Sequence, residues 1–173
     1  MTSIWTEVLC RQFDQAFELL EAAIRDCPDN LWTLGMWELT ADDWWPSEGA
    51  DAYMTRRSTP WSVAWHALEV ADYDLTGDLT PFSPPPPFTN KAHWRDLAHL
   101  PRAWSQSELL SYTEELRRRA TDTLSVMTDG KASTPLPPTH RHSGEPYAWL
   151  VMNIPLHTVE HAAQIRQFIT TAG

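Results

Sequence analysis

Four stretches of the chain repeat apolar residues at steps of three and four, the period of a helix that buries one face. These stretches run over about residues 4–26, 60–75, 105–128 and 145–170. No convincing segment alternates apolar and polar residues with the period of two that marks a half-buried strand. The pattern therefore predicts an all-α fold, an antiparallel four-helix bundle that forms one domain over residues 1–173.

The residues at the ends of these stretches support the helix boundaries. Thr59 is a suitable cap for the second helix, with Pro60 at its first position, and Gly77 follows its end. Ser105 and Glu108 have the spacing of a capping box before the third helix. Pro155 falls inside the fourth helix, where we expect it to kink the helix or to start a new one.

The first-to-second and second-to-third connections are both long, covering about residues 30–59 and 79–104. The chain has ten tryptophans, and several lie in the segment from Trp32 to Trp61, called here the tryptophan-rich segment. Long loops in compact domains are usually functional or packed. We expect this segment to form a packed cover over one end of the bundle, where it could line an apolar pocket.

The charge balance limits the partners of the chain. Its net charge of −10 argues against binding to nucleic acid or to an anionic membrane, because both need a basic surface. No apolar run approaches the roughly 20 residues that span a bilayer, and the N-terminal residues lack a signal-peptide core. With only two cysteines, and neither beside a base, we expect a cytoplasmic protein without a thiolate nucleophile.

Two histidines four residues apart, His157 and His161, stand in the fourth predicted helix. On a helix this spacing puts both rings on one face, from which they can reach one metal ion. They share a predicted core-facing stripe with Ile154, Gln164 and Phe168. Two interpretations fit: two core histidines bonded to nearby acceptors, or two metal ligands. A third histidine, His66 in the second helix, favours a metal, because the two helices can be neighbours in a bundle.

The residues 60–66 (PWSVAWH), together with His157 to Ile165 (HTVEHAAQI), resemble the DinB-like superfamily of helical-bundle proteins, which includes bacillithiol- and mycothiol-dependent transferases. The order and length of the four predicted helices are also similar. The family often has a glycine where this chain has Ala163, and Pro155 is a second departure. The resemblance implies that His66, His157 and His161 bind one divalent metal, for which zinc, nickel, iron and cobalt are all acceptable.

Several neighbouring residues are candidates for supporting roles. Glu160 and Glu69 each lie within one turn of a histidine. Each is either a hydrogen-bond acceptor for the N–H of a ligand ring or an exposed salt-bridge partner. Gln164 could assist at the metal or tie adjacent helices together. Trp61 and Trp65 are candidate pocket-lining residues. The four remaining histidines are expected at the surface of proline-rich loops. They are His93, His99, His140 and His142.

Three histidine ligands leave a metal with open positions, as catalysis requires. By resemblance, the protein would be a metal-dependent transferase that activates a low-molecular-weight thiol, or a hydrolase that activates water, for attack on a small electrophile. The alternative is a non-catalytic bundle in which the metal stabilises the fold or a homodimer. The substrate, the thiol and the oligomeric state stay open at this stage.

Overall fold

The computed structural model describes residues 4–37, 57–88 and 102–172. These residues form helices and loops, with a single isolated bridge between Pro135 and Pro146, so the predicted all-α class is confirmed for them. The helices are α1 (Ile4–Asp26), α2 (Asp29–Trp32), α4 (Pro60–Thr76), α5 (Gln106–Ser125), α6 (Asp129–Ala132) and α7 (Tyr147–Ala172). None of these helices combines the length and apolar character that crossing a bilayer requires.

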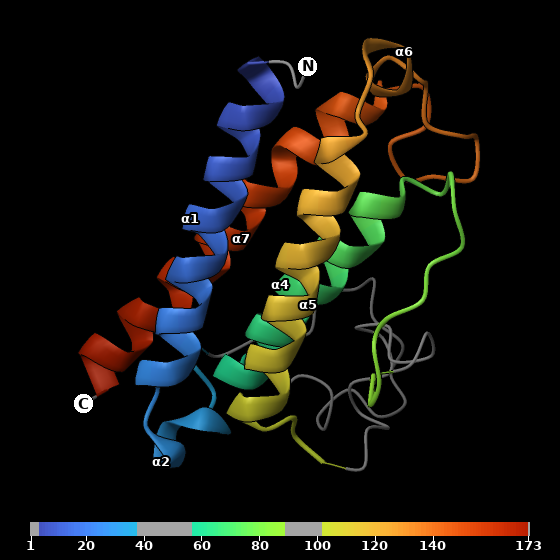
Figure 1. The fold of residues 1–173 in the computed structure, drawn as a ribbon. Coiled ribbons are helices and arrows are strands. Elements are labelled where there is room, and N and C mark those ends of the chain that lie inside the picture. Colours follow the sequence, from blue (N-terminus) through green and yellow to red (C-terminus); the bar gives the residue numbers. More distant parts are fainter. Residues whose placement is uncertain (1–3, 38–56, 89–101, 173) are drawn as a thin grey trace.

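The four long helices pack in a square, with α1 and α4 each lying against both α5 and α7 (Figure 1). The amide of Gln106, at the start of α5, donates to the carbonyl oxygens of Ile24 and Cys27 at the end of α1, so these helices are antiparallel. Tyr147, which begins α7, donates its hydroxyl to the carbonyl oxygen of Leu75 at the end of α4. The helices α1 and α7 consequently run one way and α4 and α5 the other. The antiparallel arrangement that we predicted thus holds for two neighbouring pairs, and the other two are parallel.

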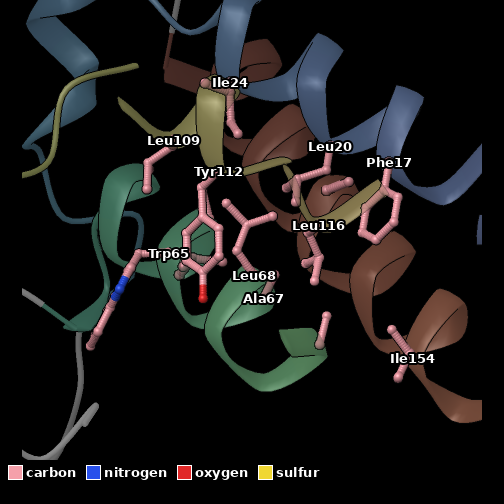
Figure 2. Packing of buried hydrophobic residues seen from close by; sticks show 14 of the residues in the cluster. Phe17, Leu20, Ile24, Trp65, Ala67, Leu68, Leu109, Tyr112, Leu116 and Ile154 are labelled. Atoms are coloured by element: carbon pink, nitrogen blue, oxygen red, sulfur yellow. The ribbon is translucent and has the colours of Figure 1, made fainter. Parts of the chain in front are cut away.

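The core lies along the axis of this square and takes residues from all four long helices (Figure 2). The cluster includes Trp65 and Leu68 of α4, Leu109 and Tyr112 of α5, Phe17 and Leu20 of α1, and Ile154 of α7. The fully buried large side chains include Trp61, Trp65, Tyr112, Tyr147, Phe17, Leu20, Ile24, Leu68, Leu109 and Leu116. This packing fixes α4 against α7, and these are the two helices that carry the candidate ligands.

The helix ends follow the capping chemistry of the sequence at Ser105 and Gly77, whereas Thr59 is the N-cap residue of α4 but makes no side-chain cap hydrogen bond. The Ser105 side chain accepts from the backbone of Glu108, whose carboxylate accepts from the backbone of Ser105, so the predicted capping box is present. Gly77 ends α4 in the left-handed conformation with φ of 57°. A Cβ atom there would come within 2.8 Å of the Tyr147 ring. Glycine is therefore required at this position for both its backbone angle and its size.

One helix boundary differs from the prediction, and one open alternative is decided. The helix α5 ends at Ser125 rather than near Thr128, because Thr128 instead caps α6 by accepting from the backbone of Lys131. The helix α7 continues through Pro155, so the alternative that a new helix starts there is wrong. Most of the tryptophan-rich segment and much of the second long connection, residues 38–56 and 89–101, lie outside the described residues.

Candidate metal centre

Three histidine rings from two antiparallel helices meet at one point between α4 and α7. His66 projects from the middle of α4, and His157 and His161 project from successive turns of α7. The ring centroid of His66 lies 5.3 Å from that of His157 and 5.1 Å from that of His161. One ligand nitrogen from each ring can be chosen so that all three lie within 4.8 Å of one another. The structure thus brings together the three histidines singled out from the sequence.

The spacing of His157 and His161 suits coordination. Their Nε2 atoms are 3.0 Å apart. Two nitrogens at roughly 2.0–2.1 Å from one ion are separated by about 2.9–3.3 Å when the angle between the bonds is about 90–110°. The same distance also suits one hydrogen bond between the two rings. The pair alone therefore fits either a metal site or a pair of bonded core histidines.

Gln164 fixes the orientation and tautomer of one of these rings. His161 Nδ1–H donates to Gln164 Oε1 over 2.8 Å, between residues one turn apart on α7. With the proton held on Nδ1, the lone pair of His161 Nε2 is directed away from Gln164 and toward His157 and His66. A histidine that binds a metal is commonly held by such a hydrogen bond from its other nitrogen.

His66 makes no hydrogen bond to any described residue, and its Nδ1 atom is buried without a partner. A buried imidazole nitrogen that lacks a partner costs free energy. The hydrogen bond between His157 and His161 accounts for those two rings but not for His66. A metal bound by the three rings would give His66 a favourable interaction that packing does not provide.

Burial keeps the cluster neutral. It lowers the pKa of His66 to about 3 and that of His157 to about 4, and it lowers the pKa of His161 as well. The mutual repulsion of the charged rings and the charge of Arg141 contribute further for His66 and His157. At neutral pH all three rings consequently have lone pairs available, which is the state that coordinates metals.

The predicted stripe on α7 needs a correction. The residues fully buried along this helix include Ile154, Thr158, Ala162 and Ile165. His157, His161 and Gln164 are half-buried and form a neighbouring line that faces α4. A helix at the corner of a square bundle has one face in the core and a flank toward its neighbour. The two histidines belong to that flank, beside the apolar face rather than in its centre.

The other candidate residues around the triad differ in burial. Glu160 is exposed, and among the described residues it has no hydrogen bond to a ligand ring, although its charge raises the pKa of His161. Glu69 is half-buried, and its charge acts on Tyr112 of α5. Trp61 and Trp65 are buried in the core. The catalytic roles suggested for the glutamates, and the pocket-lining role of the tryptophans, stay predictions.

One of the histidines expected at the surface is buried. His140 is only 3% exposed, and its ring stacks on Tyr73 with an interplanar angle of 6°. The prediction of a surface residue was therefore wrong. The loop before α7 folds back over the end of α4, where Arg141 forms an ion pair with Asp74, and periodicity in the sequence carries no signal for this contact. His142 is half-buried beside Trp149, and His93 and His99 lie outside the described residues.

Among the described residues, the triad is the one group of three or more potential ligands close enough to share an ion. Comparisons of the chain with protein-family models, with curated proteins and with solved structures find no match. The functional argument consequently rests on the geometry of this site and on the family resemblance of its motifs.

Proposed function

We propose that the chain is a DinB-like protein that binds one divalent metal ion through His66, His157 and His161 and uses it in an enzymatic reaction. The reaction is the transfer of a low-molecular-weight thiol, or of water, to a small electrophile. The observation that carries the proposal is the convergence of three neutral imidazoles from two helices. Two further observations support it: the separation of 3.0 Å between two ligand nitrogens, and the His66 Nδ1 atom that is buried without a hydrogen-bond partner among the described residues.

Four residues of the chain would have defined roles at the metal. His66, His157 and His161 would hold the ion, and the Gln164 carbonyl oxygen would keep the His161 proton on Nδ1. When bound, the ion would supply Lewis acidity, which lowers the pKa of a coordinated thiol or water toward neutrality. Three neutral ligands leave its positive charge uncompensated, so an anionic nucleophile is the group that the site favours. Zinc, nickel, iron and cobalt all accept this ligand set.

A second function is favoured by the position of the ligands. Because they join α4 to α7, a bound ion would also cross-link two helices of the bundle. If all coordination positions of that ion were filled, it would stabilise the fold without catalysing a reaction. The two functions differ in whether a coordination position is open to small molecules.

One experiment separates them. The untagged protein is loaded with zinc, nickel, iron or cobalt, and steady-state turnover is measured with a panel of small thiols and electrophiles. The enzymatic proposal requires multiple turnovers that disappear in His157→Ala. The structural function would be established instead by three results together: one metal ion per chain that raises the melting temperature, no turnover, and an absorption spectrum of the cobalt-loaded protein that added thiols leave unchanged.

A further inference from the structure

The loop that precedes α7 lies against the end of α4 and places an arginine near the candidate metal centre (Figure 1). Arg141 is held there by the buried Asp74 of α4, over 2.8 Å from Nη2 to Oδ2. Asp74 lies just over two turns past His66 on the same helix, a rise of roughly 12 Å. Burial is the main cause of the low pKa values of His66 and His157, and the charge of Arg141 lowers both further. The guanidinium group is therefore within electrostatic reach of two of the ligands.

Contacts on both sides of Arg141 fix the loop that carries it. The His140 ring is buried and stacks on Tyr73 of α4, with ring centroids 5.7 Å apart. The Nδ1 atom of His140 accepts from the backbone N–H of His142 over 3.0 Å. The His142 ring packs in turn against Trp149 of α7, with centroids 4.9 Å apart. The backbone at Arg141 is thus joined to α4 and to α7, the two helices that carry the ligands.

The guanidinium group of Arg141 keeps donors for a ligand. Only its Nη2 atom donates to Asp74, and among the described residues Nη1 and Nε have no acceptor. The Arg141 side chain is 49% exposed and that of Asp74 is 7% exposed, so the pair has one buried partner and one that faces solvent. A guanidinium group that is already oriented loses less conformational entropy when it binds a carboxylate. Arg141 therefore has the position and the N–H groups of an anion-binding residue.

Other charges around the triad also favour an anion. The charge of Arg57, which precedes α4, adds to burial and to the neighbouring rings in lowering the pKa of His66. The exposed Glu160 raises the pKa of His161, but burial has the larger effect and lowers it. The three rings are neutral, so a bound divalent ion would add two positive charges here. In a chain with a net charge of −10, such a concentration of positive charge attracts an anionic small molecule.

We propose that Arg141 binds a carboxylate group of the small molecule that reacts at the metal, and so selects anionic substrates. This role of Arg141 rests on the function proposed above for the triad. Because Asp74 anchors Arg141 about two turns along α4 from His66, the carboxylate would lie roughly 8–12 Å from the reacting atom. A reactant without a carboxylate at that distance would bind more weakly.

The first test detects the anion site without any metal. The arginine Nε–H signals of metal-free protein are followed by NMR while glutarate, a small dicarboxylate, is added. The Arg141 signal, identified by its absence in Arg141→Gln, should shift with a dissociation constant below about 10 mM. Glutaramide, which is uncharged, should not shift it. Arg118 is the matched internal control, because it pairs with Glu115 on the exposed surface of α5. Its signal should move far less.

The second test asks whether this anion site serves the metal. Cobalt-loaded protein is titrated with glutathione, which has two carboxylates, and with its diethyl ester, which has none. The thiolate-to-cobalt absorption band gives both dissociation constants. Glutathione should bind at least about tenfold more tightly than the ester to the wild type. This preference should fall to about threefold or less in Arg141→Gln, and Arg118→Gln should keep it.

A second variant guards against misfolding. Arg141→Gln alone leaves Asp74 buried without its partner, which destabilises a fold. Arg141→Gln combined with Asp74→Asn removes both charges, and circular dichroism checks that it keeps the helical fold. This double variant should lose the preference for glutathione to the same extent as the single variant.

The outcomes distinguish the role of Arg141 from the function of the metal. Cobalt bands of equal affinity for both thiols, with no glutarate shift at Arg141, would overturn the role of Arg141 and leave the metal function in place. A glutarate shift at Arg141 without a cobalt band from either thiol would support the anion site and contradict the thiol reaction. A preference for glutathione that persists in both Arg141 variants would overturn the proposal, because another group would then bind the carboxylate.

Discussion

The Nε2 atoms of His157 and His161 lie 3.0 Å apart on successive turns of α7, and the ring of His66 from α4 closes the third side of the cluster. A single hydrogen bond explains two of these rings. It does not explain the third ring, whose Nδ1 atom is buried without a hydrogen-bond partner among the described residues. The proposed metal site accounts for the convergence of all three half-buried rings, and it leads to predictions that can be tested residue by residue.

The first prediction concerns the ligands. His66→Ala, His157→Ala and His161→Ala should each reduce bound metal from one equivalent per chain to less than about 0.1, because two imidazoles hold a divalent ion far more weakly than three. Elemental analysis of untagged protein measures this directly. His142→Ala, which removes a half-buried histidine from the loop before α7, is the control and should keep the full equivalent.

The second prediction concerns Gln164. Gln164→Ala removes the acceptor for His161 Nδ1–H, so the ring is free to change tautomer and to rotate. Metal affinity should fall about 10- to 100-fold, as for other residues that orient a metal ligand. Competition with a chelator gives the affinity. Gln167→Ala, at an exposed position one turn further along α7, should retain wild-type affinity. Equal affinities for the two variants would mean that Gln164 has only a packing role.

The third prediction tests the contact between α4 and α7 at the other end of these helices. Gly77→Ala should lower the free energy of unfolding by about 2–4 kcal/mol, because it combines a left-handed backbone with a clash against the Tyr147 ring. Gly144→Ala is the matched control: φ is 88° there, but nothing lies within 4 Å of the added Cβ. It should cost only about 1 kcal/mol. Chemical denaturation measures both, and equal costs would show that the Tyr147 ring moves aside freely.

The fourth prediction is a pH dependence from Asp74, which is buried and paired with Arg141. Burial raises its pKa to about 6, and the charge of Arg141 only partly opposes this. The folded state therefore binds this proton more tightly than the unfolded chain. The resulting stabilisation is complete below about pH 4 and is lost as the pH rises through about 6, with a total of at most about 3 kcal/mol.

Asp74→Asn should remove that contribution. The buried histidines act in the opposite direction over the same range, because their pKa values are lowered. For this reason the informative quantity is the difference in unfolding free energy between variant and wild type, from pH 4 to pH 7. It should shift in favour of the variant as the pH rises.

Local signals in the sequence were sufficient for the long helices. The bounds of α1 were predicted to the residue, and the capping box at Ser105 and the end of α4 at Gly77 were also correct. These features depend on residues close in sequence. The spacing of His157 and His161 is local in the same sense. His66 was singled out because its helix can be a neighbour of theirs in a bundle, and the family resemblance implied the three histidines as one ligand set.

Contacts between distant segments were beyond such reasoning. The burial of His140 results from a loop that packs on Tyr73, 67 residues earlier in the chain, and no periodic pattern marks it. The hydrogen bond that pairs Tyr147 with Leu75, and with it the mixture of parallel and antiparallel neighbours, is likewise a property of tertiary packing. The flank position of the two α7 histidines also follows from packing, because it depends on which side of the helix meets α4.

X-ray absorption spectroscopy of the untagged, metal-loaded protein tests the central claim most directly. We predict one ion per chain with three imidazole ligands at about 2.0–2.1 Å for zinc, and loss of that signature in His66→Ala. A first shell of sulfur at about 2.3 Å from Cys10 or Cys27, or an imidazole shell that His66→Ala leaves unchanged, would contradict the proposed site.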